Sequence, residues 1–261
     1  MNQANRLARQ GLRVAVLLIG VVTIVQAAPI AGVLTLGGQA ETTQTTIDYT
    51  PFIPGAALNG TGNLVVTANG TGFFSPLLFA DIPVIVDRSV VAGVVPAQPA
   101  GSPILVPDWL TFPTKPLFRY ALDLTYISPG TFSSVACFDP PAVGQVCTPP
   151  APVPFTSPYN LTNFFDGTRL SANANFSLRG LVRNIDTNLV EYTFDGIFGA
   201  EFQGISYQTI LATVSVPDGA VLSGFSGTIN VTAIPEPSTT VLIGMGSSML
   251  ALGLLRRRRR S

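Results

Sequence analysis

The sequence predicts an all-β protein, either an antiparallel β-sandwich or a distorted barrel, with a helix at each end of the chain. In the body, short runs of period two are separated by turns rich in Gly, Asn and Pro, and no long stretch has helical periodicity. Near both termini the chain has uncharged apolar runs. We therefore expect three parts: a signal peptide at 1–27, an exported β-rich domain at 28–234 and a C-terminal signal at 235–261.

The N-terminal segment has the pattern of a secretory signal peptide. Three arginines precede an apolar run at 14–25, which is too short to span a bilayer but fits a signal-peptide core. Small residues predict cleavage after Ala27, because cleavage after Ala28 would leave Pro29 as the first residue. The Sec machinery and signal peptidase are the expected partners, and an uncleaved N-terminal anchor is the alternative.

The first part of the body predicts short strands. Asn-Gly-Thr-Gly occurs at 59–62 and again at 69–72, on either side of a strand-like stretch. Asn-Gly favours type I′ hairpin turns, so this repeat predicts a β-meander. In the apolar run at 73–86, Pro76 and Pro83 limit strands to short or edge positions. The proline-rich segment 95–116 is expected to run over the surface.

The second part gives clearer signals. Apolar and polar side chains alternate at 118–126, which is typical of a half-buried strand. Segment 139–158 contains seven prolines and is expected to be a loop. Strand-like runs follow at 169–182, 189–198, 205–216 and 222–233. About eight to ten short antiparallel strands are expected in all.

The two cysteines, Cys137 and Cys147, predict a disulfide, because an exported chain favours oxidation of so close a pair. Such a bond would add about 2–3 kcal/mol by the chain-entropy estimate. Metal binding is the competing interpretation. It has little support because the sequence has no histidine to complete a site.

The charge of the body limits its partners. Residues 28–234 contain six basic and 13 acidic side chains, which leaves a net charge of −7. Nucleic acid and anionic lipid surfaces are therefore not expected to bind the body.

Little catalytic chemistry is expected. The absence of histidine excludes Ser-His-Asp and Cys-His catalysis, and we expect neither a cofactor nor a metal. The acids Asp186, Glu191, Asp195 and Glu201 leave open a pair of glycosidase carboxylates, although solubility is the commoner role of such acids. We therefore interpret the chain as a protein without enzymatic activity.

Binding through aromatic side chains is a further alternative. Trp109, Phe112 and Tyr120 are candidates for a surface that stacks on sugar rings. Core packing is the more frequent fate of such residues.

The C-terminal segment combines three features. Pro235-Glu236-Pro237 precedes an uncharged run at 238–255 and then a basic cluster. A helix over that run would cover about 27 Å, close to the hydrocarbon thickness of a membrane. The cluster would stop translocation and remain in the cytoplasm. It consists of Arg256, Arg257, Arg258, Arg259 and Arg260. An ordinary tail anchor is the alternative.

These three features in this order resemble the PEP-CTERM sorting signal of Gram-negative bacteria. The resemblance implies processing by an exosortase, a membrane-embedded enzyme similar to cysteine transpeptidases. It implies a precursor anchored in the inner membrane and a product at the cell surface or in the exopolysaccharide of a biofilm matrix. The alternative for the body is a carbohydrate-binding or carbohydrate-cleaving module of that matrix.

Overall fold

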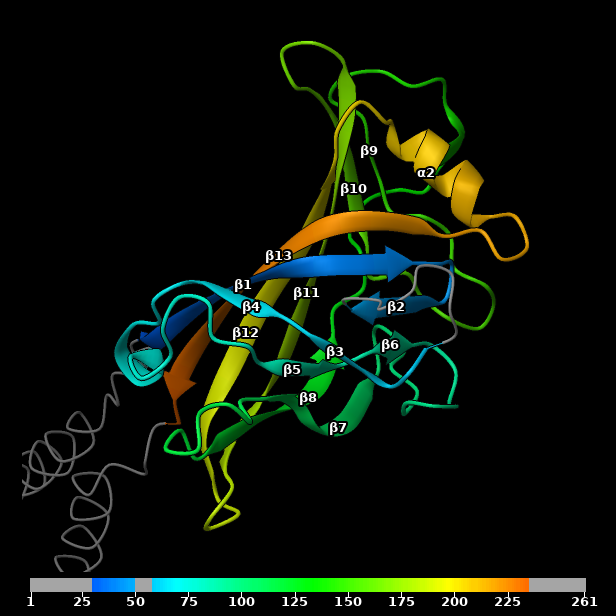
Figure 1. The fold of residues 1–261 in the computed structure, drawn as a ribbon. Coiled ribbons are helices and arrows are strands. Elements are labelled where there is room, and N and C mark those ends of the chain that lie inside the picture. Colours follow the sequence, from blue (N-terminus) through cyan, green and yellow to red (C-terminus); the bar gives the residue numbers. More distant parts are fainter. Residues whose placement is uncertain (1–29, 50–57, 235–261) are drawn as a thin grey trace, which may run out of the picture.

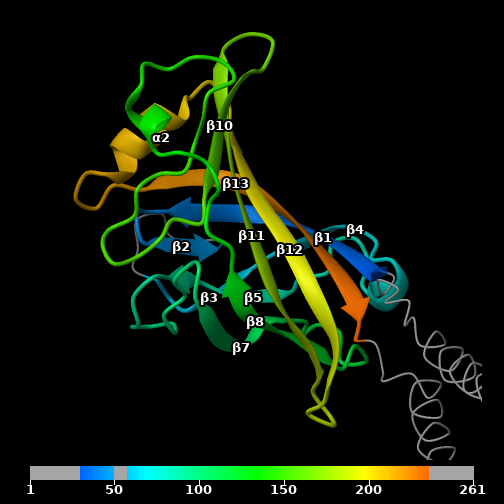
Figure 2. The same cartoon turned by 180° about the vertical axis from the view of Figure 1, so that it is seen from behind.

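The computed structural model describes residues 30–49 and 58–234, which form one curled antiparallel sheet of 13 strands (Figures 1 and 2). The predicted all-β class is confirmed. The strands outnumber the eight to ten expected, because several segments of only two to four residues add short pairings.

Five long strands form the regular half of the sheet. In spatial order they are β8 (Tyr120–Ile127), β11 (Leu170–Asn184), β12 (Val190–Phe202), β13 (Val221–Ala233) and β1 (Ile30–Thr42). The alternating runs predicted β8, β11, β12 and β13 close to their observed positions, although β12 continues to Phe202. The sequence patterns gave no expectation for β1.

The other half of the sheet is less regular. It contains β7 (Pro103–Thr111), β5 (Val84–Val86), β3 (Thr61–Asn63) and β4 (Val65–Ala68). β3 pairs with β5, whereas β4, which follows after one residue, pairs with β1. The pairings therefore close into a ring, which favours the distorted-barrel alternative over two separate sheets.

Short elements complete the structure. β2 (Thr46–Tyr49) and β6 (Arg88–Ser89) continue the sheet beyond β1, and β10 (Asn160–Phe165) joins β9 (Val146–Cys147) to β11. The helical elements are η1 (Gly72–Phe74), η2 (Val135–Phe138) and α2 (Tyr207–Val214).

The core fills the inside of the curl. The largest fully buried side chains include Trp109, Phe194 and Phe198, and the ring of Trp109 stacks on that of Phe194 at 5.8 Å between centroids. Alternation along β11 places Phe176, Leu178 and other inward residues against the same cluster. Burial of these side chains is the main favourable contribution to the fold.

The type I′ turns expected at the two Asn-Gly-Thr-Gly repeats do not form, although β3, β5, β7 and β8 are antiparallel neighbours in chain order. Gly60 has φ of 106°, but Asn59 does not have the positive φ that a type I′ turn requires at both central residues. The Asn59 side chain instead accepts a hydrogen bond from the backbone N–H of Thr61. The stretch between the repeats contains β4, which pairs with β1, and the end of β3, which pairs with β5.

Two further expectations are corrected. Segment 95–116 contains β7, which includes Pro107 because its pairing with β8 is irregular and Asp108 takes a φ of 53°. The strand-like run 205–216 contains the helix α2, which begins after Ser206 because the Ser206 side chain accepts a hydrogen bond from the Thr209 N–H. Apart from the two residues of β9, the loop expected at 139–158 is confirmed.

Candidate functional site

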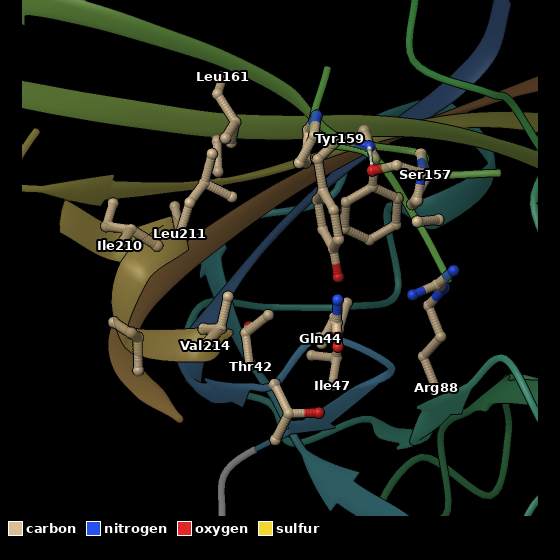
Figure 3. Close-up of a pocket in the computed structure, with 18 of the residues that line it drawn as sticks. Thr42, Gln44, Ile47, Arg88, Ser157, Tyr159, Leu161, Ile210, Leu211 and Val214 are labelled. Carbon is tan, nitrogen blue, oxygen red and sulfur yellow. Dashed lines mark hydrogen bonds between the residues drawn. The ribbon is translucent and has the colours of Figure 1, made fainter. Parts of the chain in front are cut away.

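A cavity of about 170 Å³ lies at one end of the curled sheet. Its floor comes from the ends of β1, β11, β12 and β13, and its sides come from α2, the segment 149–159 and strands β2 and β6. Figure 3 shows Ile210, Leu211 and Val214 of α2 on one side and Arg88 of β6 on the other. The mouths of curled or barrel-like sheets are common positions for small-ligand sites.

The lining is predominantly apolar. It combines aromatic side chains of the sheet with aliphatic side chains of α2 and four prolines of the segment that precedes β10. These residues include Phe176, Phe202, Phe225, Leu161, Pro149, Pro150, Pro152 and Pro158. Such a lining suits an apolar body better than a sugar, whose hydroxyl groups would need many hydrogen-bond partners.

Polar contacts hold α2 over this cavity. The fully buried Asn163 side chain accepts a hydrogen bond from the Tyr207 N–H at 2.9 Å and donates one to the Gln208 side chain at 2.9 Å. Gln208 in turn donates to Gln145, and the Tyr207 hydroxyl donates to the Ala136 carbonyl. The helix is therefore fixed both to β10 and to the loop around η2.

The predicted disulfide between Cys137 and Cys147 is confirmed, with 5.3 Å between the Cα atoms. Both cysteines are buried in a small cluster with Leu161, Tyr207 and Ile210. The bond thus connects η2 and β9 beneath the same helix that covers the cavity.

Arg88 is the charged residue that lines the cavity. Arg88 is 3% exposed. Its Nε and Nη2 atoms make no hydrogen bond within the described residues. Within the described part of the chain, no carboxylate lies within 4.0 Å of it. Its guanidinium lies over the Tyr159 ring at 5.9 Å from the centroid.

Two hydroxyl groups of the lining also lack partners. The Tyr159 Oη and Ser223 Oγ atoms are buried and make no hydrogen bond within the described residues. Burial raises the pKa of the Tyr159 hydroxyl, and the nearby positive charge of Arg88 partly offsets this increase. Figure 3 shows the Tyr159 hydroxyl directed into the space that Arg88 also borders.

Asp87, the residue before Arg88, serves a different purpose. Its fully buried carboxylate accepts hydrogen bonds from the N–H groups of Tyr49 at 3.1 Å and Gly60 at 3.0 Å. It thereby joins β2 to the start of β3, where a Cβ on Gly62 would lie 1.8 Å from the Tyr49 carbonyl oxygen. Burial raises the pKa of Asp87 to about 6, despite these two hydrogen bonds.

The three aromatic residues considered for sugar stacking do not share a surface. Trp109 is 1% exposed and Phe112 is 6% exposed, so both belong to the core. Tyr120 is partly buried, and its hydroxyl donates to Glu191 at 2.9 Å. Trp109 and Phe112 therefore pack in the core, which was the alternative to sugar stacking in the sequence analysis.

The four acids considered as a glycosidase pair have separate surroundings. Asp186 pairs with Arg119 at 2.5 Å, and Asp195 pairs with Arg179 at 3.0 Å. Glu191 accepts hydrogen bonds from Tyr120 and Asn184, and Glu201 is exposed on β12.

The predicted signals at both ends lie outside the described residues. This applies to cleavage at Ala27 or Ala28, to Pro235-Glu236-Pro237, and to the apolar run and arginines that follow. Between residues 30 and 234, in the described parts, no helix is long and apolar enough to cross a membrane.

Comparison with protein families identifies these C-terminal residues. Residues 233–260 match the PEP-CTERM protein-sorting motif. The chain carries a PEP-CTERM motif. The match contains the tripeptide, the apolar run and the arginines from which the sequence predicted it. A PEP-CTERM motif implies an extracellular protein that is targeted by an exosortase, with export and a membrane-anchored precursor. The chain has no match among curated proteins or solved structures.

Sequence reasoning missed the cavity in the β-rich body. Arg88, Tyr159 and Ser223 come from three segments that are far apart in the sequence. One local signal was present: Arg88 is one of only six basic residues between 28 and 234, and it lies in an apolar stretch. A charge in such a stretch indicates either an ion pair or a binding site.

Proposed function

We propose that the chain is exported, processed by an exosortase and retained at the cell surface or in the exopolysaccharide matrix of a Gram-negative bacterium. The observation that carries the proposal is the PEP-CTERM motif at 233–260, behind a β-rich body and an N-terminal signal-peptide pattern. The net charge of −7 on residues 28–234 suits a body that remains in solution outside the cell.

The body is proposed to act without catalysis. The four acids considered as glycosidase carboxylates, Asp186, Glu191, Asp195 and Glu201, are engaged in separate ion pairs or hydrogen bonds or are exposed, so they supply no pair of catalytic carboxylates. The carbohydrate-binding alternative loses its main residues, because Trp109 and Phe112 are buried. Binding on a glycan array or hydrolysis of polysaccharide by the purified protein would contradict this part of the proposal.

Processing at the tail can be tested with one substitution. Glu236 offers the single charge of the tripeptide, and a proline on each side favours an extended segment of the kind that a protease binds. We expect Glu236→Ala to leave membrane insertion intact but to block processing, so that a heavier membrane-bound precursor accumulates. Immunoblots of membrane and secreted fractions, from cells with and without an exosortase, would measure this.

The matched control is Glu201→Ala, which removes an exposed glutamate from β12 without changing the tail. This variant should be processed like the wild type. If wild-type protein remains full length in cells that contain an exosortase, the tail is an ordinary anchor and the proposal is wrong.

A further inference from the structure

Arg88 is a buried cation without a counter-charge. A charged group that leaves water loses a large hydration free energy, and proteins ordinarily compensate with an ion pair. Every ion pair in the described residues involves other basic residues. The ring of Tyr159 stabilises the guanidinium, but it does not neutralise its charge.

The segments outside the described residues contain almost no acidic side chain that could pair with Arg88. Residues 1–29 and 50–57 contain no aspartate or glutamate, and residues 235–261 contain only Glu236, which belongs to the sorting motif. Asp87 is adjacent in sequence, but its two carboxylate oxygens accept backbone hydrogen bonds at the junction of β2 and β3. Among the described residues Arg88 therefore has no ion-pair partner, and a bound anion would supply its counter-charge.

The cavity beside Arg88 has the size and lining for a small apolar ligand. Its volume of about 170 Å³ is similar to that of an engineered apolar cavity of about 150 Å³ that binds benzene. Arginine is suited to carboxylates because its planar donor groups match the two oxygens. The unpartnered hydroxyl groups of Tyr159 and Ser223 border the same space.

We propose that this cavity binds a small monocarboxylate with a compact apolar body, such as an aromatic acid. The carboxylate supplies the counter-charge of Arg88, and the apolar body lies among the phenylalanine, proline and α2 side chains. This inference does not depend on the export proposal, because it rests only on residues of the β-rich body.

Fluorine NMR provides a direct test with two probes. The full-length chain in phospholipid nanodiscs is titrated with 4-fluorobenzoate and, separately, with the uncharged 4-fluorobenzyl alcohol. Empty nanodiscs give the background from partition into lipid. We expect the wild type to bind the benzoate more tightly than the alcohol, since hydrogen bonds to charged groups are stronger than neutral ones.

Arg88→Met should reduce the affinity for 4-fluorobenzoate by about tenfold or more and leave binding of the alcohol unchanged or tighter. Arg179→Met is the matched control, because Arg179 is exposed and pairs with Asp195 outside the cavity. It should keep the wild-type affinity for both probes. Ala200→Leu places added methyl groups at the cavity lining, so it should weaken binding of both probes.

Urea unfolding of the ligand-free wild type and variants shows whether a loss of binding is caused by a loss of folding. Replacing an unpaired buried cation by an apolar side chain of similar length should leave the midpoint unchanged or raise it. Three results would overturn the proposal: no benzoate binding by the wild type, equal binding of the two probes, or unchanged benzoate affinity in Arg88→Met. The first of these would mean that solvent alone satisfies Arg88.

Discussion

Asp87 shows how a single buried residue can set the pH dependence of stability. Its carboxylate is fully buried and accepts the Tyr49 and Gly60 N–H groups, and among residues 30–49 and 58–234 no cation pairs with it. Burial therefore raises its pKa from 3.8 to about 6 in the folded state. The folded protein binds a proton more tightly than the unfolded chain, so protonation of Asp87 favours folding.

Acidification is thus predicted to stabilise the wild type relative to Asp87→Asn. The contribution of Asp87 is least favourable above pH 6, improves as the pH falls through about 6, and is constant below 4. The difference in unfolding free energy between the two proteins should change by up to about 3 kcal/mol over this window. Urea denaturation at pH 7, 5.5 and 4 would measure it. A difference independent of pH would contradict the assigned pKa.

A second buried carboxylate, that of Asp123, differs from Asp87 because it forms an ion pair. Asp123 is 5% exposed and binds the Arg183 guanidinium through both oxygens, at 2.7 and 3.0 Å. It also accepts the N–H of Asp108, the β7 residue with positive φ. The pair therefore holds the irregular part of β7 against β8 and β11.

Asp123→Ala should destabilise the protein by about 2 kcal/mol or more, since it removes two hydrogen bonds from Arg183 and leaves the Asp108 N–H unpaired. Asp108 still pairs with Arg183 in this variant, which limits the loss. Asp186→Ala is the control, because it breaks the exposed pair with Arg119 and should cost no more than about 1 kcal/mol. Urea midpoints of the two variants provide the comparison. Similar losses for both variants would show that burial of the Asp123 pair is unimportant.

At the level of elements, the disulfide and α2 act together. The bond between Cys137 and Cys147 orders the loop to which Tyr207 and Gln208 attach the helix. Without it, we expect the protein to lose about 2–3 kcal/mol of stability and the α2 amides to exchange faster with solvent.

Cys147→Ser, with and without a reducing agent, tests this expectation by thermal unfolding and hydrogen exchange. Reducing agent should lower the melting temperature of the wild type but not that of the variant, which has already lost the bond. If hydrogen exchange in α2 were unchanged after reduction, the disulfide would not stabilise the helix through the loop.

The elements differ in how well the sequence predicted them. β11 and β13 bury residues at alternate positions along most of their length, so period-two patterns located them. β7 contains prolines and a positive φ that the tertiary contacts of Asp123 stabilise, so its local sequence indicated a loop. α2 has only eight residues, too few for helical periodicity to stand out from a strand-like run.

The sorting motif and the cavity also differ in how well the sequence predicted them. The motif is a continuous stretch of sequence, so its residues were predictable without a structure. The cavity depends on the closure of the sheet, which brings Arg88, Tyr159 and Ser223 together from distant segments. Closure itself depends on the pairing of β4 with β1, which no local pattern encodes.

At the scale of the whole molecule, the last strand of the body ends where the motif begins, because β13 ends at Ala233 and pairs along its length with β1 and β12. Removal of residues 235–261 is therefore predicted to leave the urea midpoint of the body unchanged. Comparison of the processed protein with the precursor in nanodiscs would measure this. A lower midpoint after processing would show that the tail contributes to the fold.

The antiparallel pairing of β1 with β13 determines the direction in which the cavity faces. The two strands run side by side in opposite directions (Figure 1). Ile30 and Thr232 pair at one end, whereas Thr42 and Val221 pair at the other end and line the cavity. A strand of 13 residues separates the two ends by about 40 Å. The chain therefore leaves β13 at the end opposite the cavity, and removal of residues 235–261 should leave the lining of the cavity intact.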